Sequence, residues 1–253
     1  MIIVGNGRVG GSLKRKANRL GVPATLVSRN SGWESIDIEE GGPIMVCTNA
    51  DDLAGVLEAT PGQRRGDLVF VQNGMLDTFL DAEGCGGNTR GLLYFAAPAR
   101  GIEPQPGGVS IFSGPHALAM VEFFQALELE ARSVPPLDFA NEMASKLIWN
   151  CVFGLLSDTL NLPVGEICRL HRSTVETVTD ELVSVCNAGI QTTLRTNETV
   201  EGLVAYSMSI PNYQGALKQW RWRNGWFAES AQRLGIETPT HDKFLVGRRP
   251  DGR

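Results

Sequence analysis

Short apolar runs alternate with turn residues and helical stretches through the first half of the chain. Each run has the length of one buried strand, and the stretches between the runs can form crossover helices. This alternation is typical of a parallel sheet with helices packed against it. The runs predict strands over Met1–Val4, Ala24–Val27, Pro43–Cys47, Leu68–Val71, Leu92–Phe95 and Val109–Phe112.

The pattern changes near Val134-Pro135-Pro136, where consecutive prolines interrupt regular structure. Beyond them apolar residues recur at steps of three and four, which predicts helices. We expect Asp138 to cap the first helix and Ser173-Thr174-Val175-Glu176 to form a capping box for the second. A third helix is expected from about Gln214 to Leu234.

These patterns predict the fold class and the domains. The chain is expected to be an α/β protein with an N-terminal Rossmann-like parallel-sheet domain over residues 1–134. An all-helical C-terminal domain is expected over residues 138–253.

A glycine-rich loop follows the first apolar run. Its G-x-G-x-x-G pattern leads into a helical stretch from Val9 to Leu20. In a dinucleotide-binding loop the first glycine permits a tight turn, the second permits close approach of the pyrophosphate, and the third lets the helix pack on the strand. Helix N–H groups would face the phosphates. We predict a dinucleotide site at Gly5, Asn6, Gly7, Arg8, Val9 and Gly10, with a plain structural turn as the alternative.

The second apolar run ends at Ser28-Arg29-Asn30, where an NAD enzyme usually has an acid for the ribose 2′-hydroxyl. A guanidinium at this place would pair with a 2′-phosphate, so Arg29 favours NADP over NAD. The alternative is a solvated charge in a loop.

Two further groups of polar residues are candidates for substrate binding and catalysis. Asn73 follows the buried run Leu68–Val71, and ligands bind at the carboxyl edge of such sheets, although Asn73-Gly74 also suits a simple turn. Glu142, Lys146 and Asn150 are spaced to share one helix face. Lys146 could protonate a carbonyl oxygen as hydride reaches the carbon, or it could form a surface ion pair with Glu142.

Charge and composition narrow the classes of partner. The formal net charge of −5 would repel nucleic acid. The five cysteines show no C-x-x-C spacing, which indicates reduced thiols and a cytoplasmic location. The three histidines lack metal-ligand spacing, so no metal is expected. We also expect neither a signal peptide nor a membrane span.

Several motifs together resemble ketopantoate reductase (2-dehydropantoate 2-reductase), in order and over nearly the whole chain. They are the glycine loop with Arg29, Val71-Gln72-Asn73-Gly74, Lys146-Leu147-Ile148-Trp149-Asn150-Cys151, Leu162-Pro163-Val164-Gly165-Glu166-Ile167, Ser207-Met208 and Asn224-Gly225. The resemblance implies NADPH-dependent reduction of a branched 2-oxo acid to pantoate, on the route to pantothenate and coenzyme A. It also implies that Lys146 is the general acid, that Asn73 and Asn150 line the site, and that Ser207 helps to hold the substrate carboxylate.

The sequence departs from the family pattern at three places. Gln219 stands where the family usually has a glutamate that orients the substrate hydroxyls, twelve residues after Ser207. Gln219 can still form hydrogen bonds to substrate, but it carries no charge to favour a protonated Lys146. Gly154 replaces a second substrate-contacting asparagine, and Thr48-Asn49 stand where a lysine often assists the cofactor phosphate.

We therefore predict an NADP-dependent oxidoreductase that reduces 2-dehydropantoate, with residues 1–134 binding NADPH and residues 138–253 binding substrate and supplying catalysis. One alternative is a reductase of a different 2-oxo acid or carbonyl, and another is a non-catalytic NADP-binding regulatory protein. Trp222 and Trp226 are expected to pack in the core or in a homodimer face. Arg221 and Arg223 are expected to point to solvent, with contact between one of them and an anionic substrate as the alternative.

Overall fold

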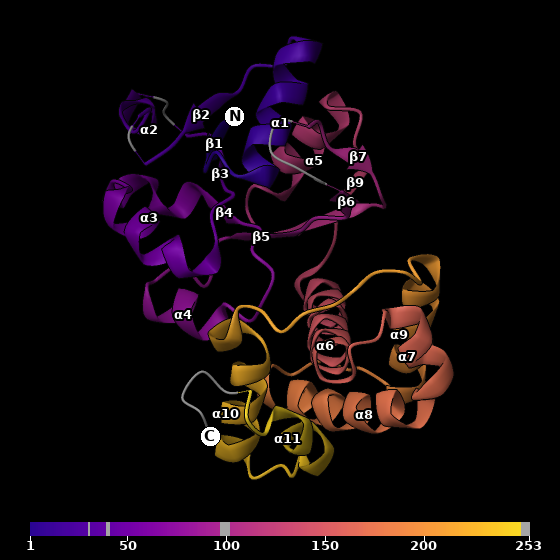
Figure 1. Ribbon diagram of the computed structural model, residues 1–253. Helices are drawn as coiled ribbons and strands as arrows, with labels where there is room; N and C mark the ends of the chain where they lie inside the picture. Colours follow the sequence, from indigo (N-terminus) through magenta and orange to yellow (C-terminus); the bar gives the residue numbers. More distant parts are fainter. Residues whose placement is uncertain (30, 39–40, 97–101, 249–253) are drawn as a thin grey trace. The chain divides into compact units, whose positions relative to one another are not determined.

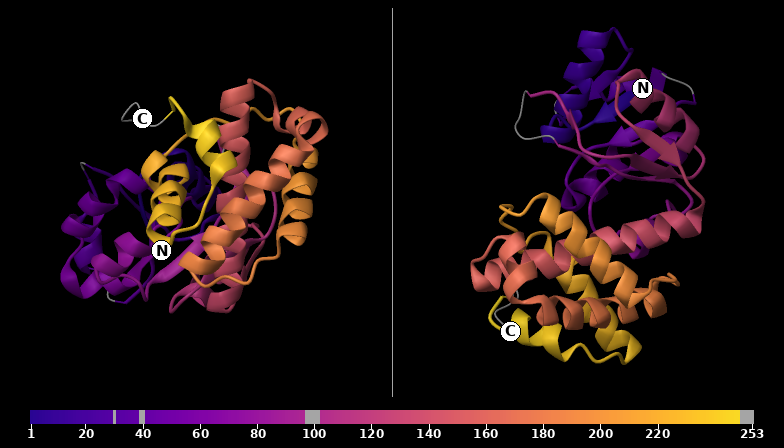
Figure 2. Two further views of the ribbon diagram at one scale, coloured as in Figure 1. Left: turned by 90° about the horizontal axis from the view of Figure 1, so that it is seen from below. Right: turned by 90° about the vertical axis from the view of Figure 1, so that its right-hand side faces the viewer.

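The computed structural model describes residues 1–29, 31–38, 41–96 and 102–248. The chain divides into two compact units, Met1–Phe139 and Ala140–Arg253 (Figures 1 and 2). Every strand among the described residues belongs to the first unit, and the described part of the second contains only helices and loops. The predicted fold class, a Rossmann-like sheet followed by a helical region, is confirmed.

Seven strands of the first unit form one sheet in the order β2-β1-β3-β4-β5-β8-β9. Neighbouring strands are parallel except for β5 and β8, which are antiparallel. The sheet strands are β1 (Ile2–Val4), β2 (Thr25–Val27), β3 (Ile44–Val46), β4 (Leu68–Phe70), β5 (Thr89–Leu92), β8 (Ser110–Ser113) and β9 (Ala131–Ser133). A separate antiparallel pair is formed by β6 (Phe95–Ala96) and β7 (Gln105–Pro106).

Two details of the sheet differ from the predicted strands. The predicted strand Leu92–Phe95 was wrong, because Leu92 ends β5 and Phe95 begins β6. The sequence analysis also missed β9, whose residues Ala131–Ser133 are short and largely polar. Ala131–Ser133 lacks the continuous apolar run that marks a buried strand, whereas the apolar run Leu92–Phe95 is divided between two strands.

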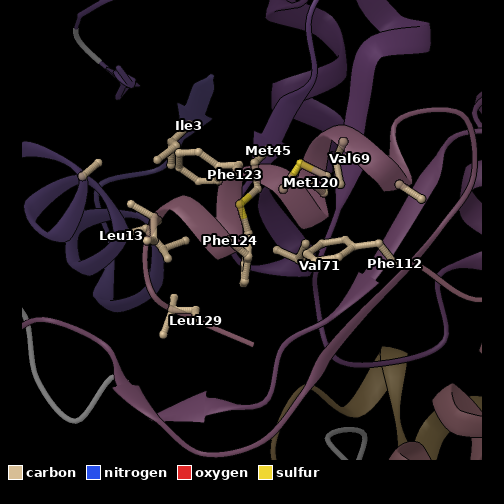
Figure 3. Close-up of a cluster of buried hydrophobic side chains, with 13 residues drawn as sticks. Ile3, Leu13, Met45, Val69, Val71, Phe112, Met120, Phe123, Phe124 and Leu129 are labelled. Carbon is tan, nitrogen blue, oxygen red and sulfur yellow. The ribbon is translucent and has the colours of Figure 1, made fainter. Parts of the chain in front are cut away.

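Helices cover the sheet, and their apolar residues form the core of the first unit. These helices are α1 (Arg8–Leu20), α2 (Glu34–Ile38), α3 (Leu53–Ala59), α4 (Asp77–Ala82) and α5 (Ala117–Ala126), with short 3-10 helices η1 (Ala50–Asp52) and η2 (Gly62–Asp67). Leu13 of α1 and Phe124 of α5 pack with Ile3, Met45 and Phe112 of the strands (Figure 3). This packing holds the start of α1 beside the end of β1.

The second unit is built around α6 (Pro136–Leu160), which continues into it from the first. Its other helices are α7 (Val164–Leu170), α8 (Arg172–Gly189), α9 (Thr196–Ser209), η3 (Trp220–Trp222), α10 (Asn224–Leu234) and α11 (Pro239–Leu245). Among the described residues no single helix is long and apolar enough to cross a membrane, and only α6 with α7, bent by 85°, meets that test as a pair.

Three predicted helix features need correction. Asp138 lies inside the first turn of α6, which begins at Pro136. Ser173 lies inside α8, so the predicted capping box was wrong, and His171 holds the N-cap position. The third helix begins at Asn224 rather than near Gln214, because the preceding segment crosses α6 as an extended loop before the short helix η3.

A buried carboxylate joins two helices that are far apart in the sequence. Glu181 of α8 accepts hydrogen bonds from the backbone N–H groups of Thr240 and His241, at 2.9 and 2.8 Å, in the first turn of α11. The His241 ring is fully buried and its Nε2 lies 2.8 Å from Oδ1 of Asn224. His241 and the Asn224-Gly225 motif therefore belong to the interior of this unit.

Candidate active site

The glycine loop between β1 and α1 has a backbone that only glycine fits. Gly5 has a φ of +109°, in the region that other residues rarely adopt. A Cβ on Gly10 would collide with the carbonyl oxygen of Gly5 and would lie 3.1 Å from Cγ2 of Ile3. In contrast, no described atom lies within 4 Å of a Cβ placed on Gly7. The loop is therefore tightly packed behind Gly5 and Gly10 and open at Gly7.

The start of α1 is suited to an anion. Gly7 is the N-cap, no side chain caps the helix, and no acidic residue lies in its first turn. The first N–H groups of a helix have no partner within it, and the helix dipole favours negative charge there. Residues of α1 and the loop can thus hold a pyrophosphate without a neighbouring carboxylate to oppose it.

Two buried polar atoms beside this loop have no hydrogen-bond partner among the described residues. They are Oγ1 of Thr48 and Oε1 of Gln72, which follow β3 and β4. The Gln72 amide nitrogen donates to the carbonyl oxygens of Val46 and Thr48, at 2.8 and 3.2 Å. A buried polar atom without a partner costs free energy, so both atoms are suited to contact a bound dinucleotide.

Arg29 follows β2 and is held only weakly. Its side chain is 87% exposed, and Nη2 lies 3.3 Å from Oδ1 of Asp52. An exposed ion pair contributes little to stability, so this guanidinium can exchange Asp52 for a phosphate at small cost. Asn73 follows β4, is exposed, and precedes Gly74 with a φ of +130°, so the Asn73-Gly74 pair also forms a turn.

Lys146 lies on α6 in the second unit, partly covered by its neighbours. Burial and the nearby Arg223 guanidinium lower the pKa of Lys146 from 10.5 to about 8. One turn later, Nδ2 of Asn150 donates to the Lys146 carbonyl oxygen at 2.7 Å, which leaves Oδ1 of Asn150 to accept from another group. The structure thus brings Lys146 and Asn150 together on one helix.

Ser207 of α9 is fully buried and its hydroxyl is already engaged. Nε1 of Trp149 donates to Oγ of Ser207 at 2.9 Å, and that hydroxyl donates to the Leu203 carbonyl oxygen at 2.9 Å. The Trp149 indole also packs against Tyr206 and Tyr213, with ring centroids 4.9 and 5.9 Å apart. Ser207 therefore fixes the tryptophan that lies next to Asn150 on α6.

The departure at Gly154 has a physical reason. A Cβ there would lie 2.9 Å from the carbonyl oxygen of Ala216, because the loop before η3 runs directly over α6. A Cβ added to Gly215, on the same loop, would lie only 2.6 Å from the carbonyl oxygen of Phe153. Gln219 ends this loop with a left-handed backbone, φ +50° and ψ +51°. The protein's own backbone thus fills the space beside Gly154.

The prediction that Arg223 points to solvent was wrong. It is only partly exposed, and burial lowers the pKa of its guanidinium. Arg221 is exposed as predicted, with its guanidinium 4.7 Å from the Trp222 ring centroid. Trp222 and Trp226 are both buried, as predicted for core packing. The alternation of Arg and Trp did not reveal the partial burial of Arg223, because the short 3-10 helix η3 ends just before this residue.

The candidate residues are divided between the two units. The glycine loop, Arg29 and Asn73 belong to the first unit, whereas Lys146, Asn150, Ser207 and Gln219 belong to the second. Among the described residues no cluster of histidine, cysteine and carboxylate side chains is arranged to hold a metal ion.

Comparison with known proteins gives matches over the helical unit and over the whole fold. Residues 138–246 match the family model described as the C-terminal domain of ketopantoate reductase PanE/ApbA. No curated protein sequence matches the chain.

Solved structures resemble the chain at low sequence identity. A PanE/ApbA family ketopantoate reductase from Ralstonia eutropha JMP134 has a TM-score of 0.77 at 16% identity, covering 96% of each chain. D-mandelate dehydrogenase, solved with NADH and anilino(oxo)acetate, has a TM-score of 0.76 at 13% identity, again covering 96% of each chain. A dimeric ketopantoate reductase from Staphylococcus aureus has a TM-score of 0.73 at 14% identity and covers 96% of this chain and 95% of its own. The resemblance indicated by the sequence motifs is thereby confirmed: the chain has the fold of these ketopantoate reductase structures, and its residues 138–246 match the model of their C-terminal domain.

Proposed function

We propose that this protein is an NADPH-dependent reductase of a small 2-oxo acid, with 2-dehydropantoate as the leading substrate. The observation that carries the proposal is the partly buried Lys146, whose pKa is lowered to about 8, in a helical unit that matches the ketopantoate reductase C-terminal domain. An ammonium with such a pKa can both stabilise a developing alkoxide and protonate it near neutral pH.

The first unit supplies the residues that would hold the dinucleotide. Gly5, Asn6, Gly7, Arg8, Val9 and Gly10 would bind the pyrophosphate with the start of α1, and Arg29 would bind the 2′-phosphate. Oγ1 of Thr48 and Oε1 of Gln72 offer further hydrogen bonds. A reduced nicotinamide bound here supplies a hydride to the keto carbon.

The second unit supplies the residues for the carbonyl. Lys146 gives its proton to the oxygen, while Oδ1 of Asn150 orients the substrate. Asn73 of the first unit is a further proposed substrate contact. Gln219 contributes hydrogen bonds without charge. The engaged hydroxyl of Ser207 supports a positioning role through Trp149 in place of the substrate contact that the resemblance implies.

One observation favours a second candidate, a reductase of a different 2-oxo acid. The Ala216 backbone lies over Gly154, where the family's second asparagine would stand, and Gln219 replaces the glutamate that orients substrate hydroxyls. The first change removes a polar group that could contact ketopantoate, and the second removes a negative charge. D-mandelate dehydrogenase, which shares the fold, is a precedent for another substrate.

The test is NADPH oxidation by the purified protein with ketopantoate, followed by absorbance, with NADH in parallel. We expect turnover with NADPH to exceed turnover with NADH, and Lys146→Ala to lower kcat by about 1,000-fold while NADPH binding is retained. Lys243→Ala, at an exposed position on α11, is the matched control.

Three outcomes separate the alternatives. Full activity of Lys146→Ala contradicts the proposed role of that lysine. Faster turnover of other 2-oxo acids than of ketopantoate supports the second candidate. Intact NADPH binding without turnover of any carbonyl compound supports a non-catalytic NADP-binding protein.

We also propose that the protein forms a homodimer, because a ketopantoate reductase with the same fold is described as dimeric. Light scattering during size-exclusion chromatography tests this directly, and a mass of one chain would contradict it.

A further inference from the structure

Among the described residues, Arg223 differs from the buried Arg64 in that its guanidinium has no hydrogen-bond or ion-pair partner. Arg64 is 6% exposed, and its guanidinium donates to Asp67, to the Ile36 carbonyl oxygen and to the Gly42 carbonyl oxygen at 2.7 to 3.1 Å. Among the described residues, Arg223 forms no side-chain hydrogen bond or ion pair, and its Nε is fully buried. Arg64 is thus satisfied within the fold, whereas Arg223 is not.

A partly buried guanidinium without partners is costly. Removing a charge from water costs free energy, and only an opposite charge or good hydrogen bonds offset that cost. Arg223 instead has a second cation, Lys146, close enough to interact with it electrostatically. The other titratable groups near Arg223 are Cys151 of α6, kept neutral by a pKa that burial raises, and Tyr213 of the loop before η3. Buried charges are usually paired with an opposite charge or with hydrogen-bond partners. A partly buried cation that has neither is typical of a binding site.

The chemistry of a 2-oxo acid matches two neighbouring cations. Its carboxylate and its keto oxygen are carried on adjacent carbon atoms, so groups that bind them must themselves be neighbours. A guanidinium is suited to a carboxylate because two of its N–H groups can donate in parallel to the two oxygens, whereas an ammonium acts as a point charge and a proton donor. Arg223 is therefore suited to bind the carboxylate, and Lys146 is suited to protonate the keto oxygen.

Ser207, which the family resemblance implies as a contact for the substrate carboxylate, already uses its hydroxyl group within the protein. The Ser207 hydroxyl is fully buried, accepts from Trp149 and donates to Leu203. We propose that Arg223 binds the carboxylate of the 2-oxo acid whose keto oxygen is protonated by Lys146. This inference rests on the proposed function and adds to it the residue that recognises the substrate carboxylate.

The proposal is tested first by binding, without turnover. Oxamate, a 2-oxo acid analogue that is not reduced, is titrated by calorimetry into the wild-type chain saturated with NADP. The variants are Arg223→Met, which keeps the length without the charge, Arg223→Lys, and the control Arg221→Met at an exposed position. We expect Arg223→Met to weaken oxamate binding about 100-fold, Arg223→Lys to weaken it less, and Arg221→Met to leave it unchanged. Thermal melting confirms that each variant is folded.

A second measurement uses substrate choice. Turnover of 3-methyl-2-oxobutanoate is compared with turnover of 3-methyl-2-butanone, which lacks the carboxylate. The wild-type protein is expected to prefer the acid strongly, and Arg223→Met is expected to lose most of that preference through a higher KM for the acid. The fall of kcat/KM at high pH, where Lys146 loses its proton, should also move to higher pH in Arg223→Met, because one cause of the lowered pKa is removed.

The outcomes separate this inference from the proposed function. Equal oxamate affinity in wild type and Arg223→Met, or no oxamate binding to the wild type, overturns the role of Arg223. Oxamate binding that depends on Arg223, without NADPH oxidation by any 2-oxo acid, supports that role and instead contradicts the proposed reductase activity.

Discussion

Each unit has a glycine in one of its motifs, Gly7 before α1 and Gly154 within α6, but their surroundings are opposite. At Gly7 the space that a side chain would fill is open among the described residues. At Gly154 the corresponding space is filled by the Ala216 carbonyl oxygen. A glycine in a motif therefore indicates a close approach without saying whether a ligand or the protein's own backbone makes it.

The largest effect is expected from Gly10→Ala. Its Cβ would meet the backbone oxygen of Gly5, which cannot move without breaking the turn after β1. We expect a loss of about 3 kcal/mol in the free energy of unfolding, together with loss of NADPH binding. Chemical denaturation and a fluorescence titration measure the two effects.

Gly11→Ala is the matched control, because its Cβ would meet only the flexible Asn6 side chain, at 2.9 Å from Oδ1. Alanine also favours the helix by roughly 1 kcal/mol. If both variants lose the same stability, the assignment of Gly10 to helix packing is wrong.

A smaller effect is expected from Gly154→Asn, which restores the residue usual in ketopantoate reductases. The new side chain must displace the loop that carries Ala216, at a cost of about 2 kcal/mol, and ketopantoate turnover should not improve. Gly202→Asn on α9, where no described atom lies within 4 Å of the added Cβ, is the control. Improved turnover at unchanged stability would show that the space beside Gly154 is available to substrate.

The smallest effect on folding is expected from Gly7→Ala. Gly7 has a φ of −85°, which alanine adopts without strain, so the melting temperature should stay within the error of the wild type. The added methyl group would stand where the pyrophosphate approaches, and NADPH affinity should fall about 10-fold. Unchanged affinity would mean that the open space at Gly7 does not face the dinucleotide.

Much of the first unit could be predicted from the sequence. Buried strands such as Ile2–Val4 and Leu68–Phe70 are continuous apolar runs, and the glycine spacing identified the turn after β1. The edge strand Ala131–Ser133 was not predictable, because a short polar strand at the edge depends on pairing with β8 rather than on its own pattern.

The second unit was harder to predict at its site. Lys146 and Asn150 were placed together correctly, because helical spacing alone brings them to one face. The engagement of Ser207 with Trp149 and the burial of Arg223 depend on contacts between helices and loops far apart in the sequence. Local periodicity carries no information about such contacts.

The carboxylate of Glu181 has a consequence for how the chain is made. Its two hydrogen-bond donors, Thr240 and His241, lie 59 and 60 residues later in the sequence. During synthesis α8 leaves the ribosome well before the residues that satisfy its buried acid. The helical unit therefore completes its interior only when α11 has emerged, and a protein truncated before α11 would lack the two backbone donors to the buried Glu181 side chain.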